Sequence, residues 1–144
     1  MRRYAAGRSG RAYDAAFPSC ETPPMKLGPV IPVMRMFDVP KAREFYQGFL
    51  GFAVDWEHRF EDGLPLYMQV SREGCALHLS EHHGDASPGA TVRIAIDDID
   101  ALHAELTAKN YGYGRPGVET MPWGLRELAA HDPFGNRLIF YAEP

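Results

Sequence analysis

Apolar and polar positions follow one another in an order that predicts a strand, a helix and three further strands in the first half of the chain. Residues 30–37 form a β-type apolar run, and residues 40–50 carry apolar side chains at helical spacing. Three strand-like runs follow, at residues 53–59, 66–71 and 75–80. The expected order of this half is therefore βαβββ.

The same order begins again after a linker over residues 84–89, which contains glycine and proline. Residues 92–96 have the pattern of a strand, and residues 100–109 have that of a helix. The Gly-, Tyr- and Pro-rich stretch 111–118 predicts only a weak second strand, and a closing hairpin supplies two more. We interpret the chain as an internal duplication of the βαβββ order.

The closing hairpin is the most distinctive segment of the chain. Two apolar runs flank the turn Asp132-Pro133-Phe134-Gly135-Asn136. Asp132 can accept from backbone N–H groups, Pro133 presets φ, and Gly135 or Asn136 tolerates a positive φ. The pattern predicts a hairpin.

Each module should form a short sheet with one face on its helix and the other face free to curl around a cavity. Strand alternation sorts the side chains between these faces. We expect these to pack against the helices: Pro32, Met34, Met36, Leu77, Leu79, Val92, Ile94, Ile96, Leu138 and Phe140. We expect these to lie on the cavity side: Ile31, Val33, Arg35, Ala76, His78, Ser80, Thr91, Arg93, Ala95, Arg137, Ile139 and Tyr141.

A chain of 144 residues has room for one domain. No apolar run approaches the roughly 20 residues that span a bilayer, so we expect no membrane partner. The two cysteines, Cys20 and Cys75, have no metal-site spacing and favour a reducing compartment, which predicts a soluble cytoplasmic protein.

Residues 1–27 differ in composition from the rest of the chain, which predicts that they form an N-terminal leader. They carry five basic and two acidic residues, a net charge of +3. Because the formal net charge of the whole chain is −4, residues 28–144 carry a net charge of −7. Three interpretations remain: a disordered tail or upstream start, with Met25 as an alternative start, a transit peptide, or a nucleic-acid-binding arm. We favour the first and expect no nucleic-acid partner. Residues 28–144 are then a single domain, with modules at about residues 29–83 and 89–143.

Several motifs carry a resemblance to a known family: Glu44-Phe45-Tyr46, Leu50-Gly51-Phe52, the turn 132–136, Trp123-Gly124 and Arg126-Glu127. With them, the chain resembles the vicinal-oxygen-chelate superfamily, which contains glyoxalases, dioxygenases and bleomycin resistance proteins. It is most similar to the bleomycin resistance proteins, small dimers that sequester the drug without chemistry. The resemblance implies an α+β fold in which two βαβββ modules form a curved mixed sheet around a cleft, and a homodimer whose clefts use both chains.

Enzymes of this superfamily hold a divalent metal at four positions, taken here by Ile31, His78, Thr91 and Ile139. An isoleucine has no lone pair to donate, and one histidine falls short of the usual three or more protein ligands. We therefore expect no metal, no other cofactor and no catalytic residue. The separate run from Glu81 to Asp85 contains two histidines and two carboxylates, and a solvated loop explains it better than a metal site does.

The resemblance places Trp56, Phe60 and Trp123 among or beside drug-contacting groups. Trp56 shares strand parity with Val54, which indicates a partly structural role, and Trp123 could instead plug a corner of the core. His78, on the cavity side, could bind a ligand or be a hydrogen-bonded cavity histidine.

Two cavity-side arginines bear on the charge of the ligand. Bleomycins are cationic with a flat aromatic tail, so positive charge from Arg35 and Arg93 disfavours them unless Glu127 or another acid pairs with it. Unpaired, these arginines would suit a carboxylate or phosphate.

The chain has no nucleophile motif and no phosphate-loop motif. Three hypotheses about its function remain. The preferred one is a metal-free protein that sequesters a bleomycin-type drug or related small molecule and so confers antibiotic resistance. The second is a lyase, isomerase or dioxygenase of the superfamily that uses His78. The third is a binder of an anionic metabolite through Arg35 and Arg93.

Overall fold

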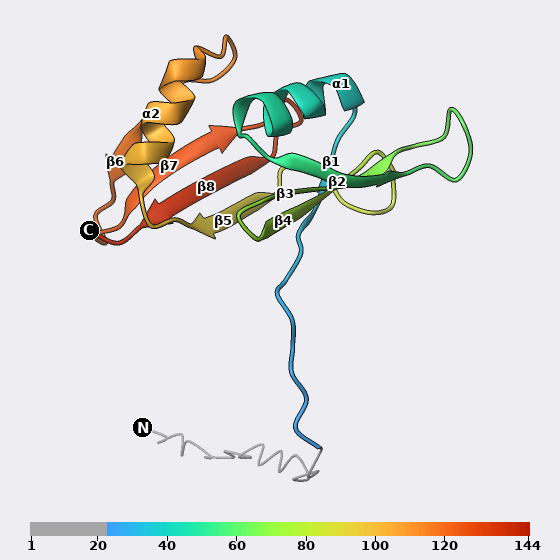
Figure 1. The fold of residues 1–144 in the computed structure, drawn as a ribbon, viewed down its shortest axis with the longest axis horizontal. Helices are drawn as coiled ribbons and strands as arrows, with labels where there is room; N and C mark the ends of the chain where they lie inside the picture. The colour runs from blue at the N-terminus through green and yellow to red at the C-terminus, as the bar shows by residue number, and fades with distance from the viewer. Residues whose placement is uncertain (1–22) are drawn as a thin grey trace, which may run out of the picture.

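The computed structural model describes residues 23–144, which form two four-stranded sheets, each with helical structure on one face (Figure 1). Residues 23–31 are exposed and run away from the sheets without regular structure (Figure 1). The rest of the predicted leader lies outside the described residues. Among the residues described, no helix is long and apolar enough to cross a membrane.

The two sheets have the same topology, which confirms the predicted duplication and the α+β fold of two βαβββ modules. The first sheet has the order β1-β4-β3-β2, and the second has the order β5-β8-β7-β6. In each, the first strand of the module pairs in parallel with the last, and the other neighbours are antiparallel. The strands are β1 (Val33–Arg35), β2 (Ala53–His58), β3 (Tyr67–Arg72), β4 (Cys75–Ser80), β5 (Thr91–Ala95), β6 (Val118–Thr120), β7 (Arg126–His131) and β8 (Arg137–Ala142).

Strand β1 is shorter than the apolar run 30–37 predicted. The carbonyl of Pro32 still accepts from the His78 N–H at 3.0 Å, but the pairing ends there. Proline has no N–H with which to continue a ladder, so Pro32 closes the edge strand at its N-terminal end.

The helices begin at equivalent aspartates in the two modules. Asp38 accepts from the Lys41 N–H before α1 (Val39–Ala42), and Asp98 accepts from the Ala101 N–H before α2 (Ile99–Lys109), both at 2.9 Å. The first helix then widens into a π-helical segment, η1 (Arg43–Phe49), whose last bond joins the Leu50 N–H to the Phe45 carbonyl. Its apolar spacing predicted a helix correctly but not this wider turn.

The core lies between the helices and the sheet faces that strand parity assigned to them. Met34, Met36, Leu77 and Leu79 are buried there, as predicted, under the aromatic residues of η1. Strand alternation predicted that Ser80 lies on the cavity side, but the structure shows that this residue is buried. Its hydroxyl donates to Asp85 at 2.6 Å and accepts from the His82 N–H, so the following loop covers it.

A buried hydrogen-bonded junction joins the two modules. Asp132 Oδ1 accepts from the N–H groups of Phe134 and Asn136 within its own turn, at 2.9 and 2.7 Å. Its Oδ2 accepts from the Tyr46 hydroxyl of η1 at 2.7 Å and from Asn136 Nδ2 at 2.8 Å. Asn136 also donates to the Arg35 carbonyl at the end of β1 and accepts from the Ala90 N–H before β5. The turn that the sequence marked as a hairpin therefore anchors both modules to each other.

The junction predicts a large difference between two substitutions. Asp132→Ala leaves the buried Tyr46 hydroxyl and the Asn136 amide without their acceptor, and should lower the free energy of unfolding by about 3 kcal/mol or more. Tyr46→Phe removes one of four donors to Asp132 and should cost about 1 to 2 kcal/mol. Urea unfolding followed by circular dichroism measures both. Small and equal losses would show that the junction is not a principal source of stability.

Candidate functional site

The first candidate surface is the face of the β2-β3-β4 sheet that the helices do not cover. We call it the first open face, and it carries Trp56, Tyr67, Gln69 and His78. The ring of Trp56 stacks on that of Tyr67, with centroids 5.9 Å apart and planes 9° from parallel. The edge of His78 meets both rings at 5.2 Å. The three side chains form an aromatic wall with Trp56 still 43% exposed.

A β-bulge brings Trp56 onto this wall. Val54 pairs with Val70 and Trp56 pairs with Gln69, so Asp55 is an extra residue with no partner in β3. The extra residue reverses the alternation, and Trp56 faces the same side as Gln69 and His78. The parity of Trp56 with Val54, on which its interpretation as partly structural rested, is therefore broken by the bulge.

A chain of hydrogen bonds runs across the first open face. Gln69 Nε2 donates to Asp55 at 2.9 Å, His78 Nε2 lies 2.9 Å from Gln69 Oε1, and the Tyr67 hydroxyl lies 2.6 Å from His78 Nδ1. The bond from Gln69, and then one with Ser71, lowers the pKa of Asp55, which stays an ionised acceptor. A carboxylate only accepts, so Gln69 turns its amide oxygen to His78. His78 then donates from Nε2 and accepts from Tyr67 at Nδ1.

Asp55, Tyr67 and Gln69 were not identified from the sequence. Gln69 and His78 are opposite one another in the antiparallel β3-β4 pair, and Tyr67 is two residues from Gln69 on the same face. The register of this pair follows from the tight turn between Arg72 and Cys75. Counting residues back from that turn along both strands would have shown that Gln69 lies opposite His78. The bulge that places Asp55 left no comparable signal.

Phe60 and Arg35 lie outside the aromatic wall. Phe60 is 73% exposed and meets His58 and His82 edge-on, with centroids 4.8 and 5.9 Å away. Arg35 stacks over Phe37 at 4.8 Å and lines a separate pocket of about 320 Å³ with Arg59 and Glu81. Its Nη1 is buried without a hydrogen-bond partner among the described residues.

The second candidate surface, which we call the second open face, lies on the uncovered side of the β5-β8-β7-β6 sheet. Arg93, Trp123, Glu127 and Ile139 line a cavity there of about 530 Å³. Arg93 donates to Glu127 at 2.6 Å and lies 4.9 Å from the Tyr141 ring. The hydrogen bond to Glu127 raises the pKa of Arg93. Glu127 is only 5% exposed, so its charge is compensated almost entirely by this pair.

Trp123 does not plug the core. It is 65% exposed and lines the cavity from a tight turn in which the Gly124 N–H donates to the Met121 carbonyl at 2.9 Å. Gly124 has φ +94°, a conformation that glycine adopts without strain. The Trp-Gly pair therefore serves to present the indole ring at the edge of the sheet.

Within residues 23–144, the cavity of the second open face receives no side chain from the first open face. The cavity around Arg93 and Trp123 is lined only by residues of the second module, and Arg35 lines a different pocket. The structure therefore separates the seven predicted ligand-binding residues into groups: Trp56 with His78, Arg93 with Trp123 and Glu127, and Phe60 and Arg35 each apart.

The donor groups present do not fit a metal ion. No group of three or more His, Cys, Asp and Glu side chains within residues 23–144 could hold one. Of the four positions expected from the resemblance, Ile139 is a buried hydrocarbon and His78 has both ring nitrogens engaged. In the loop after β4, Glu81 accepts from the Leu66 N–H and Asp85 accepts from Ser80. These carboxylates stabilise the loop.

Comparisons with known proteins agree with this geometry. Residues 21–143 match the family model described as glyoxalase superfamily protein. The bleomycin-binding protein of bleomycin-producing Streptomyces verticillus, solved with copper(II)-bleomycin, is 31% identical. The match covers 83% of this chain and 99% of that one, with a TM-score of 0.63. No curated protein matches the chain.

Two further solved structures share the fold. TnmS3, an antibiotic-binding protein from Streptomyces sp. CB03234, is 24% identical, with 83% of this chain and 99% of that chain covered and a TM-score of 0.62. A bleomycin resistance determinant encoded on the transposon Tn5 is 20% identical, with 81% and 98% covered and a TM-score of 0.62.

The hydrogen-bonded chain predicts a single neutral tautomer of His78 with the proton on Nε2. A long-range ¹H–¹⁵N correlation spectrum at neutral pH reports the tautomer directly. Tyr67→Phe should retain it, because Gln69 still accepts from Nε2. Gln69→Leu should give a mixture of tautomers, because the group that selects the donor nitrogen is lost. A proton on Nδ1 in the unmodified protein would contradict the proposed direction of the chain.

Proposed function

This chain belongs to the glyoxalase superfamily, and from that membership we propose that it is a metal-independent binding protein that sequesters a bleomycin-type drug or a related small molecule in the cytoplasm. The observation that carries the proposal is the aromatic wall of Trp56 and Tyr67, which is preassembled by the bulge and the hydrogen bonds of His78. A flat aromatic group can stack on an exposed indole face without first ordering it.

The electrostatics of the second open face support the same ligand class. Arg93 would repel a cationic drug if its charge stood alone, but Glu127 neutralises it at 2.6 Å. The four charged residues that line this cavity, Arg93, Arg137, Glu119 and Glu127, carry no net charge. The Streptomyces verticillus protein of the same fold binds copper(II)-bleomycin, as its structure records.

The two alternative functions have less support. A metal-dependent lyase, isomerase or dioxygenase needs a donor set that these side chains do not supply. An anion held between Arg35 and Arg93 would have to bridge two different pockets, and Arg93 is already paired with Glu127.

A homodimer would complete the site, and we propose one. Residues 23–144 of a single chain present an aromatic wall on one module and an exposed Trp123 on the other, and the cavity beside Trp123 is lined by the second module alone. A two-fold axis that sets the first open face of one chain opposite the second open face of its partner would create two equal clefts. This arrangement is the one implied by the resemblance to drug-binding dimers.

Titration with metal-free bleomycin tests the ligand. The chain has two tryptophans, Trp56 and Trp123, so the drug should quench intrinsic fluorescence with micromolar affinity. Trp56→Ala and Trp123→Ala should each weaken binding by about tenfold, the scale of one aromatic stacking contact. Tyr113 is an exposed aromatic residue that belongs to neither open face, so Tyr113→Ala should leave the affinity unchanged. No fluorescence or heat signal at high drug concentration would refute the proposal.

Mixing the two tryptophan variants tests the composite cleft. In a heterodimer of Trp56→Ala and Trp123→Ala chains, one cleft receives both intact tryptophans and the other receives neither. Random exchange should therefore restore high-affinity binding in about one quarter of the clefts. Calorimetry of the mixture after partial unfolding and refolding gives the number of sites. A mixture that binds no better than its separate components, or a protein that sediments as a monomer, would contradict the shared cleft.

A further inference from the structure

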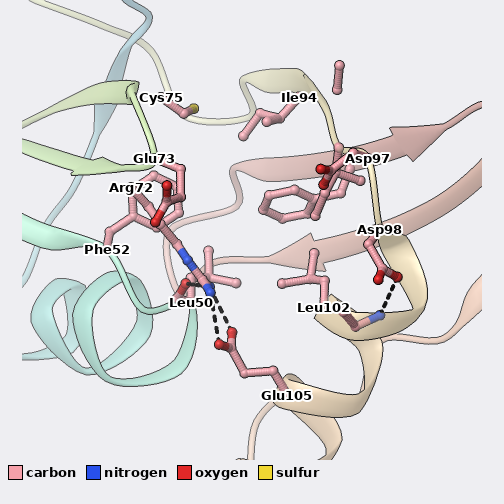
Figure 2. A pocket seen from close by; sticks show the side chains of 14 residues that line it. Leu50, Phe52, Arg72, Glu73, Cys75, Ile94, Asp97, Asp98, Leu102 and Glu105 are labelled. Carbon is pink, nitrogen blue, oxygen red and sulfur yellow. Dashed lines mark hydrogen bonds and ion pairs between the residues drawn. The ribbon is translucent and has the colours of Figure 1, made fainter.

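A third cavity, of about 470 Å³, lies between the modules on the helix side of the sheets, opposite to the open faces (Figure 2). Its volume is within the range of about 300 to 1,000 Å³ typical of small-molecule pockets. The first module contributes Leu50 and Phe52 after η1 and the Arg72–Cys75 turn between β3 and β4. The second module contributes the end of β5 and the first turn of α2.

The cavity exists because α2 does not cover the whole of its sheet. This helix packs on β6, β7 and β8, and the helix-side residues of β5 are left only partly buried. An apolar wall open toward Phe52 of the other module is therefore formed by Ile94 of β5, Ile96 directly after it, Leu102 of α2 and Phe140 of β8. An apolar surface of this kind favours a ligand with an apolar body.

The polar groups around this wall are predominantly acidic. Within residues 23–144, Arg72 is the only cation in the lining; it donates to both oxygens of Glu105, at 2.7 and 2.8 Å, and to the Leu50 carbonyl (Figure 2). The hydrogen bond to Glu105, and then the charges of Glu105 and Glu73, raise the pKa of Arg72.

Three more carboxylates line the cavity: Glu73, Asp97 and Asp98. Asp98 caps α2, whereas Glu73 and Asp97 have no hydrogen bond or ion pair within the described part of the chain. With the Arg72–Glu105 pair neutral, the lining carries a net charge of −3. Glu73 comes from the first module and Asp97 from the second, so negative potential reaches the cavity from both sides (Figure 2).

We propose that this inter-module cavity binds a small cationic amphiphile, a molecule with a hydrocarbon or aromatic body and a protonated amine. The body lies against Ile94, Leu102 and Phe140, and the amine lies at the mouth, where Glu73 and Asp97 are free to accept hydrogen bonds. An anionic ligand would meet the net negative charge of the lining, and a purely polar cation would leave the apolar wall in water. The site is separate from both open faces and does not depend on the drug-binding proposal.

Cys75 provides a reporter for the cavity, because its half-buried thiol lines one wall. We propose to measure its alkylation by N-ethylmaleimide through peptide mass spectrometry. Three matched probes are added in turn: 2-phenylethylamine, 2-phenylethanol and 3-phenylpropionate. The amine should slow alkylation of Cys75 at least fivefold when saturating. The alcohol should protect less, and the carboxylate should not protect.

Two kinds of variant test the chemistry of the site. Combined Glu73→Gln and Asp97→Asn substitutions should weaken binding of the amine about threefold to tenfold, the effect of losing two partly exposed charge contacts. Asp62→Asn, which removes an exposed carboxylate that does not line the cavity, should have no effect. Ala101→Phe, a substitution at an exposed lining position of α2, should fill the cavity and slow Cys75 alkylation without any probe.

Several results would overturn the proposal. Calorimetry of 2-phenylethylamine with the unmodified protein gives the affinity even if Cys75 reacts slowly, and absence of binding at millimolar concentration refutes the site. Equal protection by the three probes would refute selectivity for a cation. Alkylation of Cys75 that becomes faster only when the protein is diluted to monomers would show that a second copy of the chain covers the cavity instead.

Discussion

The buried carboxylate of Asp132 is the contact on which the arrangement of the two modules depends. Each four-stranded sheet with its helix is a small unit, and a unit of this size buries too little apolar surface to be very stable alone. Asp132 accepts four hydrogen bonds, one of them from Tyr46 of the other module, and Asn136 extends the network to the ends of β1 and β5. A buried charge is tolerated only when it is fully hydrogen-bonded, so the network requires one relative placement of the modules.

That placement decides which surfaces remain for binding. Each helix covers one face of its sheet, which leaves two open faces on the opposite side, and the incomplete cover of β5 by α2 leaves the inter-module cavity on the helix side. The open faces and the cavity differ in chemistry. The open faces combine aromatic rings with compensated charge, whereas the cavity combines apolar side chains with a net negative charge.

The aromatic wall shows how a local irregularity can determine a site. A regular β2 strand would turn Trp56 to the same side as Val54, toward the helices. The single extra residue at Asp55 turns the indole to the open face and also places the carboxylate that orients Gln69 and, through it, His78. Bulges are frequent beside functional sites because they redirect a side chain at little cost to the sheet.

The order of elements, the duplication, the closing hairpin and most of the core could be predicted from the amino-acid sequence, because hydrophobic periodicity and turn residues act over a few neighbouring positions. It also identified Arg93 with Glu127 as a possible pair, and Ile139 as a residue unable to bind metal. The orientation of Trp56, the partners of His78 and the burial of Ser80 became evident from the folded chain, since these depend on a bulge, a strand register and a covering loop. Long-range packing likewise created the inter-module cavity, because its walls come from segments that are adjacent only after the modules join.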